Sequence, residues 1–227
     1  MVAILADSVV PCESGCQSQR NPTVVDPDRP PQHIVALAFV FEGGLGAAAL
    51  LLGWLLGRWP LPGIQFSGVA WTAWAGAIAA CAVAAGPMLL LLLVVERFPG
   101  GPFRELKRIV DELVVPLFAR CRLWEMAGIS LIAGIGEELL FRGLLQQGLA
   151  DWLGPPRGVW LALLVSSLLF GVGHWLCTGY AVLAAVIGAY LGLLLIGTGN
   201  LLVPATAHAL YDFVALVYLV KWKPCRC

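Results

Sequence analysis

Apolar residues run in six long segments that are separated by shorter polar stretches. The segments cover residues 34–57, 69–95, 124–149, 159–175, 180–198 and 201–220. A helix that crosses a bilayer needs about 20 apolar residues at a rise of about 1.5 Å per residue. The fourth segment is short, and a GTGN turn joins the last two tightly. The pattern predicts an all-α, polytopic membrane protein with about six transmembrane helices.

The connection over residues 96–123 has a different pattern. Between Phe103 and Phe118, apolar residues recur at helical spacing, and charged residues occupy the opposite face. This arrangement is typical of an amphipathic helix at a membrane surface. We therefore predict one interfacial helix on the cytoplasmic side, with a helix packed on the protein itself as the alternative.

These elements divide the chain into four parts. Residues 1–32 contain five prolines among polar residues, which is typical of a disordered tail. The first ten residues lack the basic region and long apolar core of a signal peptide, so the first segment is expected to direct insertion uncleaved. Residues 33–123 hold two transmembrane helices and the interfacial helix, residues 124–220 a four-helix core, and residues 221–227 a cytoplasmic tail.

Composition supports a membrane protein and excludes other classes. The chain is 59% hydrophobic and 12% charged, whereas soluble domains carry about 25% charged residues. The formal net charge of zero gives no indication of a nucleic-acid partner. Seven irregularly spaced cysteines do not suggest a disulfide framework. The pairs Cys12/Cys16 and Cys225/Cys227 are interpreted as reduced thiols in the tails.

The distribution of Lys and Arg predicts the topology. With the N-terminus in the cytoplasm, eleven of the 14 basic residues fall on the cytoplasmic side. Arg58 and Arg157 fall on the other side, and Arg142 lies within a segment. This bias follows the positive-inside rule. We expect an integral protein of the plasma membrane with both termini in the cytoplasm.

Few ionisable residues lie inside the six segments, where each charge costs at least about 2.5–3.5 kcal/mol. They include Glu42, Glu137, Glu138, Arg142, His174, His208 and Asp212. Glu138 and Arg142 are four residues apart, a spacing that suits an ion pair on one helix face. Glu137 has no basic residue four positions away, so it needs a partner from another helix, and His174 and His208 are the candidates.

A carboxylate and two imidazoles in a buried site are suited to hydrolysis. A nearby histidine would hold Glu137 in the ionised form that a general base needs to take a proton from water. A second histidine with a donor beside it would stabilise an oxyanion. Two structural readings stay open. The Glu138–Arg142 pair could serve helix packing alone, and Glu42 could have an interfacial or structural role.

Three motifs resemble those of a known family. "EELLFR" (Glu137, Glu138, Arg142), "FGVGH" (ending at His174) and "HALYD" (His208 to Asp212) are similar to the EExxxR, FxxxH and HxxxN/D motifs of the CAAX protease and bacteriocin-processing (CPBP, or Abi) family of intramembrane proteases. The resemblance covers residues 124–220 and implies a peptidase site that opens toward the cytoplasm.

The resemblance also implies roles for the residues. Glu137 would be the general base together with His174, and His208 with Asp212 would lie at the oxyanion. Glu138 and Arg142 would order the site. The partners would be membrane lipid and a membrane-associated or lipidated peptide. Prenylated C-termini, leader peptides and sorting tails all fit this class.

One residue departs from the better-understood members of the family. Where an Asn amide would donate a hydrogen bond to the oxyanion, this chain has Asp212, which can donate only when protonated. Asp212 could instead orient His208 or bind a metal. We favour no cofactor, with zinc held by Glu137, His174 and His208 as the alternative. Outside the peptidases, a proton or ion transporter and an immunity protein that retains the fold are the rival hypotheses.

Overall fold

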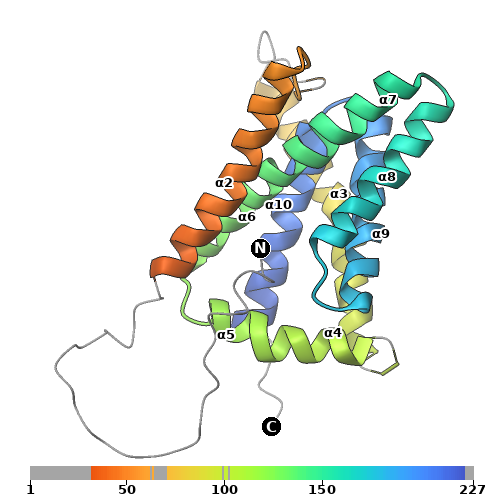
Figure 1. Ribbon diagram of the computed structural model, residues 1–227. Helices are drawn as coiled ribbons and strands as arrows, with labels where there is room; N and C mark the ends of the chain where they lie inside the picture. Colours follow the sequence, from red (N-terminus) through yellow and green to blue (C-terminus); the bar gives the residue numbers. More distant parts are fainter. Residues whose placement is uncertain (1–31, 62, 64–70, 99, 102, 223–227) are drawn as a thin grey trace, which may run out of the picture.

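The computed structural model describes residues 32–61, 63, 71–98, 100–101 and 103–222, and every regular element in these ranges is a helix (Figure 1). The all-α prediction is confirmed for this part of the chain. Nearly all of the predicted N-terminal tail, both terminal cysteine pairs and the last five residues lie outside the described residues.

The long helices follow the predicted apolar segments. In chain order the α-helices are α2 (Gln32–Leu55), α3 (Trp71–Arg97), α4 (Phe103–Ile109), α5 (Val115–Phe118), α6 (Leu123–Glu138), α7 (Gln147–Leu153), α8 (Arg157–Gly173), α9 (Thr178–Thr198) and α10 (Leu202–Val217). In the described part of the chain, three π-helical segments lie between or after them: η2 (Val110–Val114), η3 (Leu139–Gln146) and η4 (Tyr218–Trp222). The third predicted segment is therefore a continuous run of α6, η3 and α7. Successive long helices run in opposite directions along the bundle (Figure 1).

Three of the described helical stretches are long and apolar enough to cross a membrane. They are Ile34–Leu55, Thr178–Thr198 and Leu202–Trp222, and α8 is apolar but shorter. On α8, Trp160, Leu164 and Leu168 are exposed, as expected of a surface that contacts lipid. The chain therefore has the character of a membrane protein. The number of six crossings and the orientation stay predictions.

Close helix contacts bring the polar residues to one level of the bundle. Helix α10 packs against α6, α3 and α9, while α2 covers another face of α6. Gly134 of α6 lies against the backbone of Ala209 in α10, and Gly136 lies against the carbonyl oxygen of Glu42 in α2. Small residues permit such approaches between membrane helices. These two glycines thus bring α6 close to both neighbours, directly before Glu137.

Replacing Gly136 by Ala is expected to destabilise the bundle by about 1–3 kcal/mol, because the added methyl group would overlap the Glu42 carbonyl. Thermal unfolding in detergent measures the change. Gly148→Ala in α7 is the matched control, since no atom outside its own helix backbone and immediate neighbours lies within 4 Å of the added carbon. We expect this control to leave stability unchanged or raise it by up to about 1 kcal/mol. Equal stability of the two variants would contradict the close α2–α6 packing.

The helical stretch α4–η2–α5 runs crosswise beneath the end of the bundle (Figure 1). Leu106, Leu117 and Phe118 on this stretch are buried. Leu117 and Phe118 join a core cluster that includes Met126 of α6 and Val217 of α10. The helical character of the stretch and its packing on the bundle are thus evident, while its position at the cytoplasmic membrane surface stays a prediction.

Candidate active site

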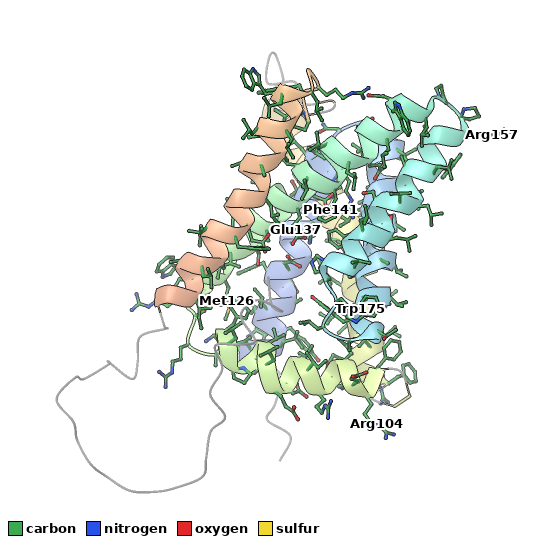
Figure 2. The ribbon with its side chains drawn as sticks, viewed as in Figure 1. Arg104, Met126, Glu137, Phe141, Arg157 and Trp175 are labelled. Carbon is green, nitrogen blue, oxygen red and sulfur yellow. The ribbon has the colours of Figure 1, made fainter. Side chains whose placement is uncertain are left out.

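Glu137 lies near the end of α6, within the bundle and away from either end (Figure 2). Its side chain faces two histidines from other helices. Oε1 is 3.6 Å from Nε2 of His174, and Oε2 is 3.9 Å from Nε2 of His208. Both separations exceed a direct hydrogen bond. The structure therefore brings the three residues to one point of a cavity wall, without a direct hydrogen bond between Glu137 and either imidazole.

His174 directly follows the last residue of α8, and its ring orientation is determined locally. Its Nδ1 lies 2.8 Å from the carbonyl oxygen of Phe170, and its ring stacks on the Phe170 ring with 4.4 Å between centroids. A carbonyl oxygen can only accept, so Nδ1 carries the proton and donates it. In the neutral ring, Nε2 then keeps a lone pair directed to the side where Glu137 lies.

Glu138 and Arg142 form a fully buried ion pair. Nη1 of Arg142 lies 2.7 Å from Oε1 of Glu138, and both side chains are 0% exposed. Arg142 also donates to the carbonyl oxygen of Gly188 in α9 at 2.9 Å, and its guanidinium lies 4.4 Å from the centre of the Phe170 ring. The pair therefore joins α6, η3, α8 and α9 around one buried cation.

Glu138 has a second partner that was not expected from the sequence. Its Oε1 also accepts a hydrogen bond from Nδ1 of His208 at 3.0 Å. This bond leaves Nε2 of His208 facing Glu137 on one side and Asp212 on the other, where Oδ2 of Asp212 is 3.5 Å away. Three carboxylates thus surround the imidazole of His208.

The site lies in the wall of a cavity of about 210 Å³. Glu137, His174, His208 and Asp212 contribute polar groups to this cavity. Most of the remaining wall is apolar and comes from α3, α4, η2, α9 and α10, including Leu92, Val95, Leu106, Leu183, Ile187 and Leu216. A ligand would therefore meet the polar groups in a largely apolar enclosure, which strengthens each electrostatic contact.

Glu42 belongs to the same cavity wall, although its role was left open by the sequence pattern. The side chain comes from α2, is only 1% exposed and lines the cavity beside the motif residues. In the sequence, the one indication of a functional role for Glu42 is that a carboxylate lies within an apolar segment. The π-helical form of η3, which carries Arg142, left no such signal, although π-helical turns occur often at functional sites.

A structural metal site needs several ligand side chains that converge on one point. Among the residues that the structure describes, no group of three or more His, Cys, Asp and Glu side chains is arranged to hold a metal ion. The zinc alternative with Glu137, His174 and His208 as ligands stays a prediction for chelation experiments.

Comparison with known proteins relates part of the chain to a family. Residues 119–214 match the family model described as type II CAAX prenyl endopeptidase Rce1-like, and this match confirms the resemblance indicated by the three motifs. The chain is 32% identical over 100 residues to the uncharacterized protein YpbD of Bacillus subtilis (strain 168). That alignment covers 43% of this chain and 47% of the relative, so it spans about half of either protein. No solved structure matches the chain.

Proposed function

On the premise that residues 119–214 are a segment of the Rce1-like CAAX protease family, we propose that this protein is an intramembrane endopeptidase for lipidated or membrane-anchored peptides. One observation carries the proposal. The carboxylate of Glu137 faces the Nε2 atoms of both His174 and His208 within a cavity wall of the bundle.

Glu137 is proposed to act as the general base. The separations of 3.6 and 3.9 Å are suited to a water molecule that bridges the carboxylate and an imidazole. Glu137 takes a proton from this water while His174 orients it, and the water oxygen attacks the carbonyl carbon of the scissile peptide bond. Glu137 then returns the proton to the leaving nitrogen as the C–N bond breaks.

His208 is proposed to stabilise the oxyanion that forms during this attack. Its Nδ1 donates to Glu138, so a charged imidazole directs its second N–H from Nε2 toward the cavity. Asp212 at 3.5 Å from Nε2 would orient the ring and balance its charge. A single donor of this kind contributes about 10²–10³-fold to the rate.

The Glu138–Arg142 pair is proposed to order these groups without touching the substrate. Glu138 holds both Arg142 and His208, and Arg142 in turn holds Gly188 of α9. The pair therefore sets the position of α10 relative to η3 and α9. This role explains a buried arginine beside a histidine better than helix packing alone.

The walls of the cavity and the family description both support the proposed substrate class. Apolar side chains of α3, α4, η2, α9 and α10 make up most of the enclosure, and the matched family is described as prenyl endopeptidases. We therefore propose a peptide that carries a prenyl or other lipid group, which reaches the site from the surrounding membrane.

Cleavage by the purified full chain in liposomes tests the proposal. The substrates are a prenylated peptide, the same peptide without its lipid, and a transmembrane peptide, with products identified by mass spectrometry. We expect cleavage of a lipidated or transmembrane peptide that persists with excess chelator. Loss in chelator and recovery with zinc would support the zinc-dependent version. Absence of cleavage of every substrate would contradict a peptidase.

A further inference from the structure

Besides Oε2 of Glu137, two buried side-chain atoms in the cavity wall have no hydrogen-bond partner among the residues that the structure describes. They are Oε2 of Glu42 on α2 and Oγ of Ser130 on α6. Each residue is only 1% exposed, and both line the cavity that holds Glu137. Buried polar atoms in native proteins nearly always have a partner, because an unpaired one is costly. Two such atoms on one cavity wall therefore point to a ligand.

Both side chains share the cavity wall with the proposed general base, Glu137. Ser130 precedes Glu137 by seven residues, which is about two helical turns and places both on one face of α6. Glu42 lies where α2 touches α6, because its carbonyl oxygen packs against Gly136. Its side chain lines the same cavity as Glu137 and His208. Ser130 and Glu137 lie about 10 Å apart along the helix axis, so an extended peptide of about three residues could reach from one to the other.

The chemistry of the pair fits a peptide main chain. Each peptide group brings one N–H donor and one C=O acceptor, and below the lipid surface both must find partners in protein. The carboxylate of Glu42 can only accept while ionised, and the hydroxyl of Ser130 can donate. We propose that Glu42 and Ser130 form a subsite that binds the main chain of the substrate peptide beside the scissile bond. This inference rests on the proposed peptidase function.

Substrate analogues with N-methylated amides on either side of the scissile bond test the subsite. In the wild type, methylation of the substrate amide whose N–H donates a hydrogen bond to Glu42 is expected to lower kcat/KM by about 10- to 100-fold. The change should appear mainly in KM. Glu42→Ala should lower kcat/KM for the parent peptide by a similar factor and add little to the loss with the methylated analogue. Glu42→Gln should recover part of the activity, because its amide oxygen still accepts. Ser130→Ala is expected to cost about 3- to 10-fold.

Two matched controls accompany these variants. Glu125→Ala removes a carboxylate of α6 that is 8% exposed and lies outside the cavity wall. Ser167→Ala removes a buried hydroxyl that donates to Leu163 within α8. Both controls should keep the wild-type ratio of kcat/KM between the parent and methylated peptides. If Glu42→Ala does not fold, Glu42→Gln supplies the same comparison with a smaller expected change.

Several results would overturn the subsite. If the losses of kcat/KM caused by Glu42→Ala and by N-methylation are fully additive, the subsite is contradicted while the proposed peptidase function still holds. A second contrary result would be that Glu42→Gln is as inactive as Glu42→Ala and that both variants lose activity only on substrates with a basic side chain. This result would show that the carboxylate binds a cation instead of the main chain. Absence of wild-type cleavage would contradict the peptidase, and the inference with it.

Discussion

Replacing Glu137 by Gln is expected to lower the rate of peptide cleavage by about 10²–10⁴-fold. The amide has nearly the shape of the carboxylate but cannot take a proton from water. His174 and His208 face this side chain at 3.6 and 3.9 Å, and neither replaces it as the base in the proposed mechanism. The measurement is kcat on a lipidated peptide in liposomes, with the amount of folded protein determined for each variant.

The control for this variant is Glu125→Gln, which removes a mostly buried carboxylate at the start of the same helix. It should retain near wild-type kcat. A double variant that combines Glu137→Gln with His174→Ala should have about the same kcat as Glu137→Gln alone, because the effects of residues that act as a unit are strongly non-additive. Undiminished cleavage by Glu137→Gln would contradict the mechanism. Ion flux through liposomes that survives this change would favour the transporter hypothesis.

Arg142→Met is expected to destabilise the protein by about 3–5 kcal/mol. The change removes the cation that pairs with the buried carboxylate of Glu138, which keeps its hydrogen bond from His208, and it removes the side-chain donor to the carbonyl of Gly188. In a chain of this size the loss corresponds to a fall in Tm of about 10 °C. Thermal unfolding in detergent measures the fall in Tm. Cleavage activity should fall in parallel, because the position of His208 depends on its hydrogen bond to Glu138.

Arg58→Met is the matched control for the buried pair. Arg58 also pairs with a carboxylate, that of Asp151 at 2.8 Å, but the two side chains are 43% and 63% exposed. Such surface pairs contribute about 1 kcal/mol or less. The double variant Glu138→Gln with Arg142→Met should recover part of the stability, since it removes both charges. An Arg142→Met variant as stable as Arg58→Met would contradict a structural role for the pair.

Local patterns were enough to predict the helices and the nearest polar contacts. Apolar runs of about 20 residues predicted the long helices, because a helix of that length fits a bilayer whenever its own side chains are apolar. The contact between Glu138 and Arg142 follows from a spacing of four residues on one helix. The family resemblance came from three motifs, each readable within a single segment.

The other contacts depend on packing between distant parts of the chain. Glu138 and His208 are 70 residues apart, and their bond requires the close approach of α6 and α10 at Gly134. The position of Glu42 beside Glu137 depends on the register of α2 against α6, which Gly46 and Gly136 permit. Neither register is encoded by hydrophobicity, because any face of an apolar helix can contact lipid or protein.

One oxygen atom of Glu138 accepts hydrogen bonds from both Arg142 and His208. Folding of the protein and cleavage of its proposed substrate therefore both depend on the same carboxylate. A screen that scores colonies or lysates for product would merge poor expression with slow chemistry at this position. Variants of Glu138 are informative only when turnover is normalised per mole of correctly assembled enzyme.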